Sequence, residues 1–136
     1  MPKKIQKTLS RCPCVGATLD KLLQPAVLVI LTKKPLHGYE LARKISAIPC
    51  FLDETPDISG IYRILKSLES RGLVTSDWDI SQGGRPKRIF AITDDGLQCL
   101  ANWNQTLQSY HKAIGSLLKT TQNALKKQAD SDATLP

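Results

Sequence analysis

Four cysteines, Cys12, Cys14, Cys50 and Cys99, are the residues of this chain best suited to metal binding or redox chemistry. If the fold brought them together, their thiolates could bind zinc or an iron–sulfur cluster. The CPC element is a weak zinc pattern, because zinc sites more often place about two to four residues between such cysteines. A thiol switch is a second interpretation, since Arg11 would favour the thiolate of Cys12. A third is that the cysteines have no special role, and burial would explain Cys99.

A second group of residues could bind a polyanion. The stretch QGGRPKRIF, residues 82–90, places Arg85, Lys87 and Arg88 around two glycines and a proline, between two runs typical of β-strands. A hairpin turn requires the glycines but not the basic side chains. The whole chain has a net charge of +7, which favours nucleic acid or an anionic membrane surface as the partner.

The sequence favours neither catalysis nor a membrane position. Its 2 histidines lie far apart, and we find no glycine-rich phosphate-binding loop and no nucleophile elbow. The apolar run Ala26–Leu31 is far shorter than the roughly 20 residues of a membrane-spanning helix. No apolar stretch follows the basic start, so a signal peptide is not predicted. We therefore expect a cytoplasmic protein with reduced thiols, no required cofactor and no enzymatic activity.

Two helices are predicted in the first part of the chain. The first covers residues 19–31, with Pro25 at its first helical position or at a kink, and with Ala26–Leu31 buried on all sides. The second follows the turn at Pro35 and ends at Pro49. Its apolar residues recur at helical spacing: Tyr39, Leu41, Ala42, Ile45 and Ile48.

A third helix and a β-hairpin come next. Asp57 is a good N-cap for this helix, and Gly72 is expected to end it. One face of the helix is apolar, with Ile58, Ile61, Leu65 and Leu68. The opposite face carries side chains that can donate to phosphates or base edges: Ser59, Tyr62, Arg63, Lys66, Ser67 and Ser70. The runs GLVTSDWDI and KRIFAIT then form the hairpin, with the basic turn at its tip.

A long helix ends the chain. Thr93 is predicted to cap it, and Asp94 and Asp95 suit its positive end. An unbroken heptad pattern, typical of a coiled-coil seam, follows at Leu100, Trp103, Leu107, Tyr110, Ile114, Leu117, Thr121 and Ala124. Such a helix is longer than the core of a small domain, so we expect it to pair with the same helix of a second copy. Packing over its own domain is the alternative.

The predicted fold is mainly α with a small β-hairpin: a winged helix-turn-helix domain followed by a long C-terminal dimerisation helix. Residues 1–18 would be a basic arm, 19–93 the DNA-binding domain, 94–127 the dimerisation helix and 128–136 a flexible tail. In a winged helix-turn-helix, the third helix can lie in the DNA major groove. The hairpin tip, or wing, would place its basic side chains beside the sugar-phosphate backbone or in the minor groove.

Residues 22–125 resemble the PadR family of bacterial transcriptional regulators. The resemblance lies in LLQPAVLVIL, PLHGYELARKI, IYRILKSLESRGLV, GGRPKRIFAIT, and DDGLQCL with Trp103, all in the family's order and spacing. It implies a homodimeric DNA-binding regulator, usually a repressor, that binds a palindromic operator in double-stranded DNA. The basic arm departs from the family pattern, because typical members begin close to the first helix.

The side-chain pattern and the resemblance together predict roles for particular residues. The DNA contacts would come from the third helix and the wing: Ser59, Tyr62, Arg63, Lys66, Arg85, Lys87 and Arg88. The dimer interface would contain Leu100, Trp103, Leu107, Tyr110, Ile114 and Leu117. Trp103 would either line a pocket for a small-molecule effector or pack in the dimer seam. A ligand, or a signal through the cysteines, would release the DNA. The alternative function is a winged-helix protein–protein interaction module that does not bind DNA.

Overall fold

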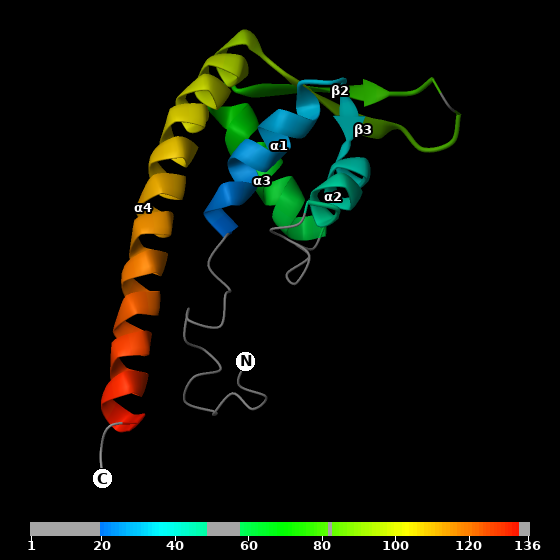
Figure 1. Ribbon diagram of the computed structural model, residues 1–136. Helices are drawn as coiled ribbons and strands as arrows, with labels where there is room; N and C mark the ends of the chain where they lie inside the picture. Colours follow the sequence, from blue (N-terminus) through cyan, green and yellow to red (C-terminus); the bar gives the residue numbers. More distant parts are fainter. Residues whose placement is uncertain (1–19, 49–57, 82, 134–136) are drawn as a thin grey trace. The chain divides into compact units, whose positions relative to one another are not determined.

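The computed structural model describes residues 20–48, 58–81 and 83–133. The chain divides into two compact units, Met1–Leu100 and Ala101–Pro136. Its elements, in chain order, are η2 (Asp20–Leu22), α1 (Leu23–Leu31), β1 (Leu36–His37), α2 (Gly38–Ser46), α3 (Ile58–Ser70), β2 (Val74–Asp79), β3 (Lys87–Ile92) and α4 (Asp94–Ala133) (Figure 1). The predicted fold class, mainly helical with a small antiparallel sheet and a long C-terminal helix, is confirmed.

The helices α1, α2 and α3 bury one apolar face each against a common core. The fully buried side chains include Val27 and Leu28 from α1, Leu41, Ile45, Ile61, Leu65 and Leu68. The predicted burial of the whole run Ala26–Leu31 is wrong, because 49% of Val29 is exposed. Only the stripe at helical spacing faces the core, so an apolar sequence does not bury every side of α1.

Three predicted helix boundaries differ from the structure or lie outside its described residues. A 3-10 turn precedes α1, so Pro25 lies in the first turn of α1 but not at its first position. A proline is still tolerated there, because the first amides of a helix have no intrahelical acceptor. The predicted stop at Pro49 and the predicted cap at Asp57 fall outside the described ranges.

The C-terminal end of α3 is formed by Gly72, as the sequence predicts. Gly72 has a φ of 76°, in the left-handed region that favours glycine. The Gly72 amide donates to the Glu69 carbonyl at 3.0 Å, and the Leu73 amide donates to the Leu68 carbonyl at 2.9 Å. These two bonds form a Schellman motif, which ends the helix and turns the chain into β2.

The sheet has three strands, whereas the sequence predicts only the hairpin. The antiparallel strands lie in the order β1, β3, β2. The strand β1 has 2 residues, and Leu36 pairs with Phe90 of β3 while His37 pairs with Ile89. So short a strand has no periodic signal in the sequence. Its pairing joins the segment before α2 to the base of the hairpin.

The helix α4 begins with the predicted threonine cap. The Gly96 amide donates to Oγ1 of Thr93 at 3.0 Å, which satisfies one free amide of the first turn. A Cβ at Gly96 would overlap the Leu73 carbonyl oxygen, so this turn packs directly on the loop before β2. The helix has 40 residues and ends at Ala133, beyond the predicted end at residue 127. Most of the predicted tail is therefore helical.

Within the described ranges of the chain, none of the helices combines the length and the apolar character that crossing a bilayer requires.

Candidate nucleic-acid interface

The outer face of α3 carries the predicted recognition side chains. Ser59, Tyr62, Arg63 and Lys66 are all exposed, on the side opposite the buried stripe of this helix. The division follows from the helical period, which separates the apolar residues from the polar ones. This face can therefore donate hydrogen bonds from hydroxyl, guanidinium and ammonium groups to a partner outside the domain.

The hairpin β2–β3 is the wing. Two glycines in its tip, Gly83 with φ 66° and Gly84 with φ 72°, adopt left-handed conformations that other residues rarely adopt. After them come Arg85, Lys87 and Arg88, all exposed. The glycines turn the chain back, and the three basic side chains follow within the returning segment.

The outer face of α3 and the wing border a common groove. One hollow of about 380 Å³ is lined by His37, Tyr39, Tyr62, Trp78, Pro86, Lys87 and Arg88. A second, of about 360 Å³, is lined by Tyr62, Lys66, Glu69, Arg88 and Phe90. Tyr62 and Arg88 line both hollows, so the two adjoin. The groove combines aromatic faces with ammonium and guanidinium groups, a combination suited to a sugar-phosphate strand.

Arg88 is held in the groove by three contacts. Its Nη2 donates to Oγ of Ser76 at 2.8 Å and lies 3.5 Å from Oε1 of Glu69. Its guanidinium carbon lies 5.5 Å from the centroid of the Trp78 ring, a cation–π distance. The Ser76 hydroxyl also donates to Glu69. The charge of Arg88 is thus partly compensated within the domain, whereas Arg85 forms no ion pair with the carboxylates among the described residues.

Lys87 and Tyr62 are also fixed by neighbours within the domain. The Lys87 ammonium lies 5.2 Å from the centroid of the Tyr39 ring. The Tyr62 ring meets the Phe90 ring edge to face, with 6.1 Å between centroids. Both predicted contact residues therefore also make contacts within the domain.

The structure separates Arg63 from the wing groove. Arg63 borders a third hollow, of about 390 Å³, on the other side of α3, together with Lys21 and Gln24. Tyr62 and Lys66 lie on the wing side of the same helix. The outer face of α3 thus has basic groups along both edges.

The sequence does not predict two aromatic residues of the groove, Tyr39 and Trp78. Tyr39 is predicted only as one of the apolar residues at helical spacing in the second helix, and 44% of it is exposed. Trp78 is predicted only as part of a strand, and 63% of it is exposed. Strand alternation could have identified Trp78, because it points to the same side of β2 as Ser76 and lies opposite Arg88. Tyr39 has no such local signal, since only the tertiary fold brings Lys87 to its ring.

The structure describes one of the four cysteines that the sequence analysis singles out. Cys99 is a half-buried free thiol in the first turns of α4, and Cys12, Cys14 and Cys50 lie outside the described residues. Within the described ranges, no three His, Cys, Asp or Glu side chains form a group that could hold a metal ion. A site that includes the undescribed cysteines stays a prediction.

The predicted dimer residues on α4 differ in exposure along the helix. Leu100, Trp103 and Leu107 are half-buried. Tyr110, Ile114 and Leu117 are exposed, by 50%, 63% and 66%. Large apolar side chains exposed at heptad spacing are typical of a helix that pairs with another helix.

Comparison with known proteins identifies a family and several relatives. Residues 27–102, more than half of the chain, match the model of the Transcriptional regulator PadR-like family. A probable transcriptional regulator of Mycobacterium tuberculosis is 35% identical over 82 residues, which are 60% of this chain. The match spans only 42% of that longer protein.

Solved structures agree with this family assignment. A candidate transcriptional regulator from Thermoplasma acidophilum is 32% identical with a TM-score of 0.63, and the match covers 74% of this chain and 94% of that one. Bacillus subtilis PadR in complex with operator DNA is 29% identical with a TM-score of 0.53, over 60% of this chain and 46% of that one.

Proposed function

This chain belongs to the Transcriptional regulator PadR-like family, and on that premise we propose that it binds double-stranded DNA through α3 and the wing. The groove between these elements carries the proposal. Lys66 lies on its α3 side, and Lys87 and Arg88 on its wing side, so one phosphate strand could touch both elements. The complex of Bacillus subtilis PadR with operator DNA supports the same partner for this chain.

The residues of α3 and of the wing would have different roles in this complex. Ser59, Tyr62, Arg63 and Lys66 would face the major groove, where side chains on a helix reach base edges. Arg85 and Lys87 would contact the phosphates beside it. Arg88 would contribute less to affinity than Arg85, because Glu69 already offsets part of its charge.

The proposed functional form is a homodimer on a palindromic operator. The apolar residues on α4 would pair with those of a second copy, and two copies of α3 would then enter half-sites about one helical turn of DNA apart. We further propose that the protein is a repressor. A ligand beside Trp103, or a change at the cysteines, would release it by altering the spacing of the two recognition helices. The proposal includes no catalytic step.

DNA affinity as a function of salt tests the proposed interface. The probe is duplex DNA from immediately upstream of the protein's own gene, compared with a scrambled duplex of equal length and composition. The variant Arg85→Ala/Lys87→Ala should weaken binding to both duplexes by a similar factor. It should also reduce the slope of log K against log salt by about 0.9 for each lost phosphate contact. The matched control is Lys126→Ala/Lys127→Ala, which removes the same charge from exposed positions on α4.

The same measurement separates the competing functions. Equal affinities for the wing variant and its control would contradict the assignment of the wing. An absence of measurable DNA binding by the unmodified protein, on either duplex, would favour the protein–protein interaction module. Repeating the titration after mild oxidation, with Cys99→Ser as the comparison, tests the cysteine-linked signal, which predicts a loss of affinity on oxidation.

A further inference from the structure

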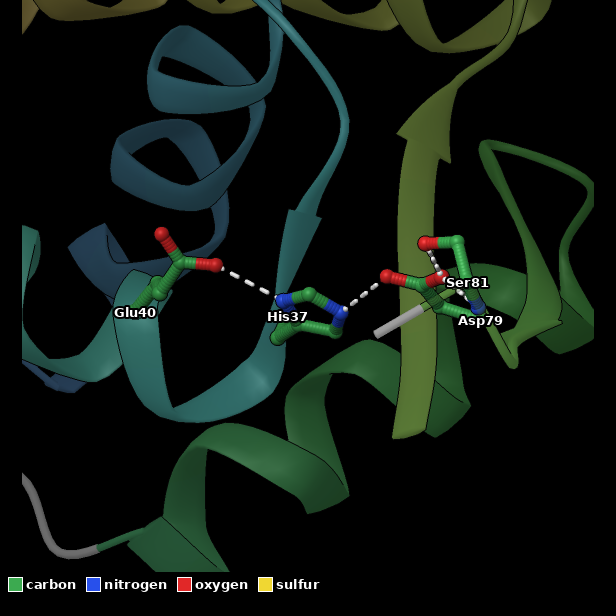
Figure 2. Close-up of polar contacts among 4 residues, drawn as sticks. All are labelled: His37, Glu40, Asp79 and Ser81. Atoms are coloured by element: carbon green, nitrogen blue, oxygen red, sulfur yellow. Dashed lines mark hydrogen bonds and ion pairs between the residues drawn. The ribbon is translucent and has the colours of Figure 1, made fainter. Parts of the chain in front are cut away.

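Glu40, His37 and Asp79 form a row of polar contacts from α2 to the wing (Figure 2). Nδ1 of His37 lies 2.8 Å from Oε1 of Glu40, and Nε2 lies 3.0 Å from Oδ2 of Asp79. The second contact passes over β3, because β3 lies between β1, which carries His37, and β2, which carries Asp79. Only 12% of the His37 side chain is exposed, compared with 34% for Glu40 and 17% for Asp79, so water reaches the imidazole less readily than the carboxylates.

The geometry of this row fits a doubly protonated imidazole. A neutral imidazole has one N–H and can donate to one carboxylate, whereas an imidazolium can donate to both. Ionised carboxylates can only accept. The hydrogen bond from His37 is the main cause that lowers the pKa of Glu40. Hydrogen bonds from the side chain and backbone of Ser81, followed by the one from His37, lower the pKa of Asp79.

Asp79 also accepts hydrogen bonds from the wing tip. Its Oδ1 accepts hydrogen bonds from the Ser81 amide at 3.0 Å and from the Ser81 hydroxyl at 2.6 Å, while Oδ2 faces His37 (Figure 2). One carboxylate therefore links the imidazole to the first residues of the turn. That turn leads to Arg85 and Lys87, the proposed phosphate contacts.

The other strand of the wing, β3, contacts the domain at the residue that pairs with Asp79. Lys87 pairs with Asp79 across the hairpin, and its ammonium lies over the ring of Tyr39. The rings of His37 and Tyr39 stack with 6.4 Å between centroids. His37, the last residue of β1, thus contacts one strand of the wing, and Tyr39, in the first turn of α2, contacts the other.

Titratable and charged groups from each neighbouring element lie near the imidazole of His37. Lys34 lies in the turn before β1 and acts on Glu40. Among the described residues, the other titratable or charged groups in its polar contacts or in the hollow it lines are Glu40 and Tyr39 of α2, Tyr62 of α3, Asp79 of β2, and Lys87 and Arg88 of β3. The carboxylates are the groups within hydrogen-bonding distance of its nitrogens.

We propose that His37 is a positioning residue for the wing, and that its protonated ring fixes the wing tip in the orientation that contacts DNA. Loss of the proton weakens the attachment with either neutral tautomer. In one neutral tautomer the Asp79 contact loses its N–H donor. In the other tautomer the hydrogen bond to the carboxylate remains, but the attraction between opposite charges is lost. The wing should therefore be held more firmly at low pH than at high pH within the range where histidine titrates. The effect on DNA rests on the proposed function.

The first test uses the full-length protein without DNA. Nitrogen-15 NMR of the imidazoles, followed from about pH 5.5 to 8.5, reports the protonation of His37 directly. We expect the amide signals of Ser81, Gly83 and Gly84 to shift with the same midpoint as the His37 ring. These wing signals should lose the transition in His37→Gln and keep it in His111→Gln, which removes the other histidine, an exposed one. A neutral His37 throughout the range, or wing signals that ignore its titration, would overturn the inference.

The second test measures DNA affinity over the same pH range at constant salt. From the lowest to the highest pH, the DNA affinity of the unmodified protein and of His111→Gln should fall. The factor of this loss should be on the order of five times the factor for His37→Gln. A pH dependence that persists unchanged in His37→Gln would refute the positioning role. Failure of all three proteins to bind DNA at every pH would instead refute the proposed function, and the NMR titration would then decide the attachment by itself.

Discussion

Gly38, the first residue of α2, lies directly against the ring of Tyr62 on α3. A Cβ at position 38 would lie 2.5 Å from Oη and 2.8 Å from Cε1 of Tyr62, closer than such atoms can approach. The glycine is needed here for space. Its backbone forms part of the surface on which the Tyr62 ring rests, so the start of α2 sets the position of a proposed DNA contact.

The variant Gly38→Ala should therefore displace the Tyr62 ring and reduce stability by up to about 1 kcal/mol, which is less than overpacking costs in a closed core, because 40% of Tyr62 is exposed and its outer end can move. Urea unfolding measures this change. Gly115→Ala is the control, because nothing lies within 4 Å of a Cβ there, and alanine in an exposed helix should be neutral or stabilising. In Gly38→Ala/Tyr62→Leu the clashing ring atoms are gone, so the two destabilising effects should not add. Full additivity would show that the contact is not the cause.

Charges placed on the apolar face of α4 should prevent self-association. Ile114→Glu/Leu117→Glu puts two carboxylates on the seam, where a partner helix would bury them at a large cost. Sedimentation equilibrium should give a dimer for the unmodified protein and a monomer for this variant. Ser109→Glu/Ser116→Glu adds the same charge to exposed positions away from the seam and should stay dimeric. Dimerisation of the Ile114/Leu117 variant would place the interface elsewhere.

Acid should weaken the contacts of Asp79 and Glu40 that attach the wing to the rest of the domain. Their pKa values are lowered in the folded state, with Ser81 the largest cause for Asp79 and His37 for Glu40. Their stabilising effect is thus present above the pKa values of the unfolded chain and is lost as pH falls through the folded values. Asp79→Asn should be less stable than the parent at neutral pH, and the difference should shrink towards about pH 2. The control is Asp77→Asn, on the same strand, which should change stability less at every pH.

Glu69 should limit the affinity of the groove for DNA. Its carboxylate lines the hollow that also contains Lys66, and it lies beside Arg88. Glu69→Gln removes this negative charge and frees the guanidinium, so DNA affinity should rise by roughly two- to fivefold in a salt-dependent manner. Stability should change by less than about 1 kcal/mol, because the ion pair is exposed. Asp132→Asn, on α4, is the control for net charge; an equal gain in both variants would exclude a local effect.

The features that the sequence predicts correctly depend on neighbours in the chain. Gly72 ends α3 because the conformation it needs is a property of glycine, and Thr93 caps α4 through an amide three residues later. The exposure of Lys66 follows from helical spacing. Each of these patterns lies within a sequence stretch of one or two helical turns, so it can be recognised without knowledge of the tertiary fold.

The features that the sequence does not predict depend on distant segments. The contact of His37 with Asp79 joins residues 42 positions apart, and nothing near either residue indicates the other. The strand β1 becomes a strand only because Phe90 and Ile89 offer it a free edge. The exposure of Val29 depends on the face of α1 that packs against the core. The apolar run does not specify that face.

The hydroxyl of Thr93 has a consequence for how force passes through the domain. It donates to the Gly72 carbonyl at 2.7 Å while it accepts from the Gly96 amide, and the Thr93 amide donates to the Leu73 carbonyl at 3.1 Å. The end of α3 and the first turn of α4 thus share one anchor, with no spacer between them. Because these hydrogen bonds join the two helix ends directly, a rotation of that first turn would also move the end of α3. Under the proposed function, such a rotation would reach the DNA contacts on α3 without a separate hinge.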